Sequence, residues 1–296
     1  MMGNAFRNLV APLLMTGITL VSAPQARAAP ACDPGKLTAR ADRTVNYMPF
    51  SERAETITIR IDGSADAACQ IVLRLSSGSG GVLLENENRL DMDIRTRQGR
   101  LLRSDGSDHF PVTLLPVTAN GVSADLVAVI PPRQSVPPGL YEGAFEVEVV
   151  SGEGVDQTAS FSLAARVASQ ADIRLAAKNG GTGGRGVDFG ALESGREGTT
   201  FVSVRSNSAY AVELESRNGW FLVLAGPGKP DERIAYATWF NGFPVPRQAV
   251  ARLPERYEPS SHDGRLNQLQ FRIGDVAGKP AGLYEDTVRL TVILLE

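Results

Sequence analysis

The sequence predicts an all-β protein made of two tandem immunoglobulin-like β-sandwich domains, the second of which lacks its last strand. Apolar and polar residues alternate in many short stretches, which is typical of strands with one buried face. The 30 glycines and 18 prolines help to form turn-like clusters between these stretches, and no long stretch has a helical period. In addition, one set of motifs occurs twice in the same order.

The repeated motifs lie at a nearly constant spacing. They are PPGLYEG (137–143) and KPAGLYED (279–286), RTVNY (43–47) and RGVDF (185–189), and, more faintly, IVLRL (71–75) and VELE (212–215). Gly139 and Gly282 are 143 positions apart, the second pair is offset by 142 positions, and the third by nearly 141. Three ordered matches indicate one unit of about 130 residues that is used twice.

Each unit contains a strongly alternating strand near its end. In the first unit Tyr141, Gly143, Phe145, Val147 and Val149 share one face, while three glutamates lie on the other. In the second unit the shared face consists of Tyr284, Asp286, Val288, Leu290, Val292 and Leu294. Earlier strands are expected near residues 55–61, 69–75, 125–130, 200–204 and 209–215. This series of short strands favours immunoglobulin-like sandwiches.

The two units end differently. The first turns at residues 151–156 and adds a strand with an apolar face of Ala159, Phe161, Leu163, Ala165 and Val167. The second continues from residue 284 to 295 in one strand and shows no counterpart of that added strand. A sandwich without its last strand exposes unpaired backbone groups and an apolar groove. The alternative is a complete sandwich in which residues 284–295 form the last strand.

One wall of the expected groove can be named from the alternation. It is a donor-strand acceptor groove lined by Tyr284, Val288, Leu290, Val292 and Leu294. A strand from another chain would complete such a groove by β-augmentation.

The N-terminal residues have the pattern of a signal peptide. Arg7 precedes an apolar run at residues 9–23, which is shorter than the ~20 residues of a membrane span. Ala26, Arg27 and Ala28 form a small-x-small site, so cleavage is expected before Ala29. The predicted division is a signal peptide at 1–28, an N-terminal sandwich at 29–168 and a C-terminal sandwich at 169–296. A net charge of −3 gives no basic patch for nucleic acid.

The chain has two cysteines, Cys32 and Cys69, and an even count in an exported chain favours a disulfide between them. The alternative is two free buried thiols. The two histidines, His109 and His262, lie in turn-like segments, and no pattern of catalytic, cofactor-binding or metal-binding residues stands out. We therefore expect binding rather than catalysis, with no cofactor.

Several of these motifs resemble the spore coat protein U domain family, which supplies subunits of archaic (Csu-type) chaperone–usher pili. The resemblance rests on VDFG (187–190), residues 202–215, IAY (234–236) with NG (241–242), residues 280–292, and, in the first unit, NYMPF (46–50), Cys69 and residues 139–149. The second unit departs from the family because it has no cysteine; Asn207, Ser208 and Tyr210 lie where the family usually has one.

The resemblance implies a place in a pilus. Subunits of this family carry an N-terminal donor segment ahead of their first cysteine, and three residues from Ala29 to Cys32 are too few for a strand of ~5 residues. The chain is therefore expected to be a tip subunit that accepts a strand. Its expected partners are a periplasmic pilus chaperone, an outer-membrane usher, the next pilin subunit and an unknown surface receptor. Its expected route leads through the periplasm to the pilus tip on the cell surface, where it would mediate attachment and biofilm formation.

Two other functions are compatible with tandem sandwiches. A periplasmic chaperone of the same system would also have two sandwiches but would fold alone. A secreted glycan-binding or glycan-degrading β-sandwich protein is the other alternative.

Overall fold

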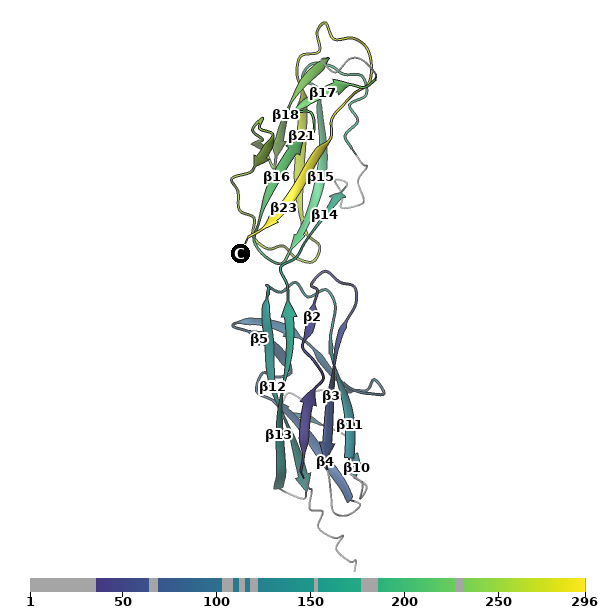
Figure 1. Ribbon diagram of the computed structural model, residues 1–296, viewed down its shortest axis with the longest axis vertical. Coiled ribbons are helices and arrows are strands. Elements are labelled where there is room, and N and C mark those ends of the chain that lie inside the picture. The colour runs from purple at the N-terminus through teal and green to yellow at the C-terminus, as the bar shows by residue number, and fades with distance from the viewer. Residues whose placement is uncertain are drawn as a thin grey trace, which may run out of the picture. The chain divides into compact units, whose positions relative to one another are not determined.

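The protein is described by a computed structural model that covers residues 36–63, 69–102, 109–111, 115–117, 122–151, 154–176, 186–226 and 232–295. The predicted signal peptide and Cys32 lie outside these residues. The described segments contain strands and no helix, and they form two β-sandwiches (Figure 1). The predicted all-β sandwich class is therefore confirmed. In the described part of the chain, no helix is long and apolar enough to span a membrane.

The first sandwich consists of two sheets. One sheet has the order β1 (Thr38–Ala41), β3 (Glu55–Gly63), β11 (Val122–Ile130), β7 (Asp93–Thr96) and β8 (Leu101–Leu102). The other has the order β10 (Leu115–Val117), β4 (Cys69–Ser77), β12 (Gly139–Ser151), β13 (Gly154–Val167) and β2 (Val45–Tyr47), with β5 (Val82–Glu85), β6 (Asn88–Asp91) and β9 (His109–Pro111) attached. β13 pairs antiparallel with β12 and parallel with β2, so both of its edges are hydrogen bonded.

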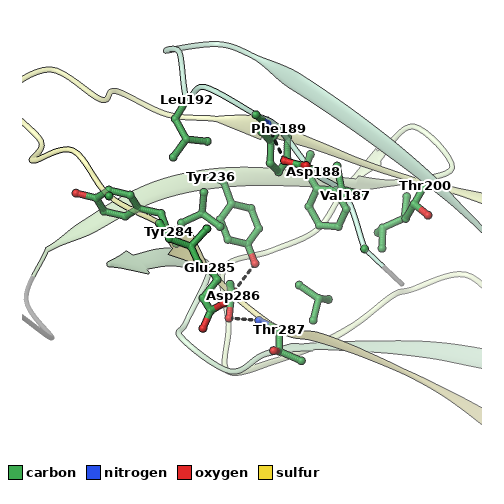
Figure 2. Close-up of a pocket in the computed structure, with 18 of the residues that line it drawn as sticks. Val187, Asp188, Phe189, Leu192, Thr200, Tyr236, Tyr284, Glu285, Asp286 and Thr287 are labelled. Carbon is green, nitrogen blue, oxygen red and sulfur yellow. Dashed lines mark hydrogen bonds between the residues drawn. The ribbon is translucent and has the colours of Figure 1, made fainter. Parts of the chain in front are cut away.

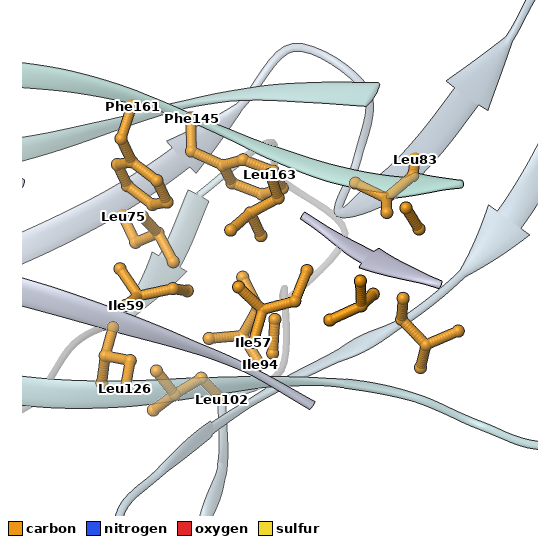
Figure 3. Close-up of a cluster of buried hydrophobic side chains, with 14 of the residues drawn as sticks. Ile57, Ile59, Leu75, Leu83, Ile94, Leu102, Leu126, Phe145, Phe161 and Leu163 are labelled. Atoms are coloured by element: carbon orange, nitrogen blue, oxygen red, sulfur yellow. The ribbon is translucent and has the colours of Figure 1, made fainter. Parts of the chain in front are cut away.

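The core of the first sandwich follows from the alternation of its strands. Ile57, Ile59 and Ile61 on β3 are fully buried, whereas the residues between them are less buried or exposed. β-Branched residues suit such a pleated, half-buried surface. Figure 3 shows Ile57 and Ile59 facing side chains of the other sheet, among them Phe145 and Phe161, whose stacked rings have centroids 5.5 Å apart.

The second sandwich also has two sheets, and they are unequal. The larger has the order β14 (Ala171–Ala176), β15 (Glu197–Ser206), β21 (Arg265–Ile273), β18 (Arg233–Phe240), β17 (Phe221–Leu224) and β22 (Tyr284–Glu285), with β19 (Phe243–Pro244) paired to β18. The smaller has the order β20 (Val250–Arg252), β16 (Tyr210–Ser216) and β23 (Val288–Leu294). Buried side chains from both sheets form one core cluster.

The two sandwiches repeat one another at matching positions. Ser77 on β4 pairs with Phe145, and Ser216 on β16 pairs with Val288, the residue 143 positions after Phe145. The third sequence match is therefore wrong by two residues, because Ser77 and Ser216 differ by 139 positions rather than 141. An error of two keeps each side chain on its face, since strands have a period of two residues.

All strands described here belong to one compact unit, Cys32–Glu296. The predicted domain boundary at residue 168 thus stays a prediction. The strand pairs nevertheless fall into two groups, one before and one after the short segment that separates β13 from β14.

Candidate functional site: the open edge of the second sandwich

The strand β23 has one paired and one open edge. It pairs antiparallel with β16, and no strand of the described residues pairs with its other edge (Figure 1). The corresponding strand of the first sandwich, β12, is paired on both sides, with β4 and with β13. Backbone N–H and C=O groups along the open edge of β23 are thus available to a further strand.

The inner face of β23 carries four of the five residues that were predicted to line an acceptor groove. Val288, Leu290, Val292 and Leu294 each lie opposite a buried residue of β16 and are themselves only partly buried. The fifth, Tyr284, lies on β22 and packs against the same core. Their function as a wall of an acceptor groove stays a prediction.

The prediction of one uninterrupted strand from residue 284 to 295 is wrong. β22 pairs with β17 in the larger sheet, whereas β23 pairs with β16 in the smaller one. The chain crosses between the two sheets at Asp286 and Thr287. The reason is a set of hydrogen bonds to a carboxylate at this crossing.

The carboxylate of Asp286 accepts hydrogen bonds from both sheets. Its Oδ2 accepts from the hydroxyl groups of Ser216 and Tyr236, each at 2.6 Å. Its Oδ1 accepts from the backbone N–H groups of Asn218 at 3.1 Å and Thr287 at 2.7 Å. Burial, and then the neighbouring Asp286, raise the pKa of the Tyr236 phenol, so the phenol stays protonated and donates. Asp286 therefore ties β16 in one sheet to β18 in the other.

A cavity of about 490 Å³ opens beside Asp286. It lies between residues 186–190 and residues 282–288, and Figure 2 shows Tyr236 and Asp286 in its lining. Its charged lining residues, Asp188, Glu285 and Asp286, are all acidic. The apolar part of the lining includes Leu175, Val187, Leu222, Leu269 and Phe271.

The segment at residues 187–189 borders the cavity and belongs to no strand. By the sequence duplication it corresponds to β2, which pairs in parallel with the end of β13. Val45 and Tyr47 on β2 are only 3% and 1% exposed, whereas Val187 and Phe189 are only partly buried. The place between residues 187–189 and β23 thus corresponds to the place that β13 fills in the first sandwich.

A second apolar wall was missed by the sequence analysis. Ile173 and Leu175 on β14 lie opposite Val204 and Val202, which are buried in the core, and therefore face the same side of the sheet. They are nevertheless 39% and 43% exposed. β14 lies against β23, whereas its counterpart β1 lies against β13 in the first sandwich. The alternation of Ala171, Ile173 and Leu175 was the signal that could have identified this wall.

The remaining residues singled out from the sequence lie away from the cavity or outside the described residues. Cys69 begins β4, but Cys32 is not described, so the predicted disulfide stays a prediction. Trp220 and Phe240 are buried in the second core. Among the described residues, no three His, Cys, Asp or Glu side chains lie close enough together to hold a metal ion.

Comparisons with known proteins give a fold-level picture. No family model matches the chain, and no curated protein sequence does. Among solved structures, the chain resembles one from the CsuC–CsuE chaperone–tip adhesion subunit pre-assembly complex of archaic chaperone–usher Csu pili of Acinetobacter baumannii, with 16% identity, 76% of this chain and 84% of that chain covered, and a TM-score of 0.43.

Two further solved structures resemble the chain. The CupB6 tip adhesin from Pseudomonas aeruginosa matches with 9% identity, 88% of this chain and 94% of that chain covered, and a TM-score of 0.40. A PapD-like domain of human CEP192 matches with 10% identity, 52% and 98% covered, and a TM-score of 0.25. At such identities a likeness concerns the fold alone.

Proposed function

We propose that this chain is an exported, pilus-adhesin-like subunit whose second sandwich is completed by a β-strand from a partner subunit. The observation that supports the proposal most strongly is the open edge of β23 above a partly exposed apolar face. In the first sandwich the equivalent place is filled by β13. An open edge of this kind is prone to aggregate until another strand pairs with it.

The occupant is an extended segment with alternating apolar residues. β13 shows what such a segment needs, because Phe161, Leu163, Ala165 and Val167 point inward and are at most 8% exposed. A strand in the same position beside β23 gains main-chain hydrogen bonds from the edge and apolar contacts from alternate side chains. It also covers Leu290 and its neighbours on the inner face of β23.

The finer assignment rests on the sequence resemblance to the spore coat protein U domain family. In that assignment a periplasmic chaperone supplies the strand first, and a pilin supplies it after passage through an outer-membrane usher. The first sandwich contacts a surface receptor, the chain sits at the pilus tip, and its role is attachment and biofilm formation through binding rather than catalysis.

The acceptor groove is tested by supplying the strand in the same chain. A copy of Gly154–Val167 is appended after Glu296 through a linker of about five Gly and Ser residues, which suits a hairpin connection. We expect the appended copy to raise the midpoint of thermal unfolding of the second sandwich and to slow hydrogen exchange along β23. The reason is that it pairs with the open edge and buries the exposed apolar face.

The matched control appends the same copy with Phe161→Asp and Leu163→Asp, which places two charges on its apolar face and keeps its length. This control should leave stability and hydrogen exchange unchanged. Equal behaviour of the two fusions, or no effect of the apolar copy on β23, contradicts the proposed function.

A further inference from the structure

The repeat between the sandwiches assigns a position to each residue of the added strand. In the first sandwich Gly143 on β12 lies opposite Leu163 on β13, and Leu163 is fully buried. A Cβ atom on Gly143 would lie 2.9 Å from Cε2 of Phe145, 3.0 Å from Cδ2 of Leu83 and 3.1 Å from the backbone oxygen of Val82, so this place is already filled. Asp286 is the counterpart of Gly143, 143 positions later. The strand that completes the second sandwich therefore places one side chain opposite a carboxylate.

A leucine at that position is unfavourable in the second sandwich. The carboxylate of Asp286 accepts hydrogen bonds from neutral donors, and no ion pair joins it to a lysine or arginine among the described residues. The nearby Arg247 donates instead to the backbone oxygen of Tyr236, at 3.1 Å. A leucine would exclude water from the charged group without supplying a compensating charge.

The shape and charge of the cavity fit a long basic side chain. Its walls are largely apolar, its charged lining residues are acidic, and its volume is about 490 Å³. The methylene stem of a lysine or arginine packs well against apolar walls while its cationic end reaches a carboxylate. Placing an acidic group in the path of an otherwise apolar strand also disfavours strands such as β13 from a second copy of the chain.

We propose that Asp286 determines the specificity of the acceptor groove and that the cavity beside it binds a lysine or arginine side chain of the incoming strand. This inference rests on the proposed strand-accepting function and adds the chemistry of the partner. The incoming strand has inward-facing apolar residues along β23 and one basic residue at the position that Leu163 occupies in β13.

The test uses the full chain and two synthetic peptides. One peptide copies Gly154–Val167 and the other is its Leu163→Lys version, so that only the residue opposite Asp286 differs. Isothermal titration calorimetry should give a dissociation constant on the order of tenfold lower for the lysine peptide, because a cation then meets a partly buried carboxylate. Added salt should weaken the binding of the lysine peptide more than the binding of the leucine peptide.

Two variants of the chain test whether Asp286 causes the preference for lysine. Asp286→Asn should abolish this preference, while Glu193→Gln, which alters an exposed carboxylate outside the cavity lining, should change the ratio of the two dissociation constants by less than about twofold. If Asp286→Asn does not fold, the salt dependence with the unaltered chain still decides the question.

The outcomes distinguish this inference from the proposed function. Equal affinities for the two peptides, or tighter binding of the leucine peptide, overturn the basic-side-chain pocket while the strand-accepting groove stands. Binding of neither peptide overturns both proposals.

Discussion

The strands β12 and β23 are counterparts in the two sandwiches, yet their inner faces differ in burial. Val147 and Val149 on β12 are 0% and 2% exposed, whereas Leu290 and Val292 on β23 are only partly buried. Both strands alternate in the same way and both pair with a strand of similar pattern, β4 or β16. The difference lies in the neighbour on the other edge, which is β13 in the first sandwich and is lacking beside β23 in the described residues. The burial of an apolar face thus depends on the neighbouring strands as much as on the alternation of its own residues.

The same comparison applies to β2 and to its counterpart in the second sandwich, residues 187–189. In the first sandwich, β2 is a strand because β13 supplies its hydrogen-bond partners. In the second, residues 187–189 have a similar sequence and form no strand. Because backbone groups in strands need a partner, this segment is expected to pair when the cavity is filled.

Among the changes proposed here, truncating a buried side chain of β13 should have the largest effect on stability. Leu163→Ala on β13 truncates a fully buried side chain and should lower the free energy of unfolding of the first sandwich by about 2–5 kcal/mol. Hydrogen exchange of β12 amides measures this loss locally. Ser162→Ala, at an exposed position of the same strand, is the control and should be nearly neutral. A neutral Leu163→Ala variant would show that β13 does not complete this core.

A matched pair of truncations compares the two inner faces directly. Val149→Ala removes buried methyl groups and should cost about 2–3 kcal/mol, while Val292→Ala at the equivalent position should cost less than about 1 kcal/mol. The free energy of unfolding from hydrogen exchange in each sandwich gives both values. In the fusion that carries the apolar copy of β13, the cost of Val292→Ala should rise towards that of Val149→Ala. Equal costs in the unaltered chain would contradict an open second core.

Local patterns in the sequence predicted much of this fold. The alternation at residues 141–149 and 159–167 identified β12 and β13, and the duplicated motifs identified the equivalence of Gly139 and Gly282. These features depend on a period of two residues and on short motifs, which need no knowledge of distant contacts.

The crossing of the chain at Asp286 could not be predicted in this way. It depends on hydrogen bonds to Ser216 and Tyr236, which are 70 and 50 positions away along the chain. In the strand pattern Asp286 is a single polar residue on an otherwise apolar face. Its hydrogen-bond partners can be identified only from the assembled sheets. The wall formed by Ile173 and Leu175 was missed for a similar reason, because a short alternating stretch does not reveal which of its faces a missing neighbour leaves exposed.

The smallest predicted difference concerns two equivalent tyrosines. The hydroxyl of Tyr141 donates to the backbone oxygen of Pro137 at 2.8 Å, and that of Tyr284 donates to Pro280 at 3.0 Å. Burial, followed by the charge of Glu85, raises the pKa of Tyr141 to about 12, whereas the pKa of Tyr284, which is also raised, belongs to a more exposed side chain. Tyr284 should therefore ionise at a lower pH than Tyr141.

The sign of the effect on stability follows from Tyr141. Its pKa in the folded protein lies above the ordinary value of 10.0, so its stabilising contribution is complete below pH 10 and is lost as the pH rises towards 12. NMR of chains with labelled tyrosine rings, assigned with Tyr141→Phe and Tyr284→Phe, follows each ionisation. Addition of the apolar strand should raise the pKa of Tyr284 towards that of Tyr141, because the strand covers its ring. Ionisation of Tyr284 at the same pH as Tyr141 before any strand is added would mean that the second sandwich is already closed at this position.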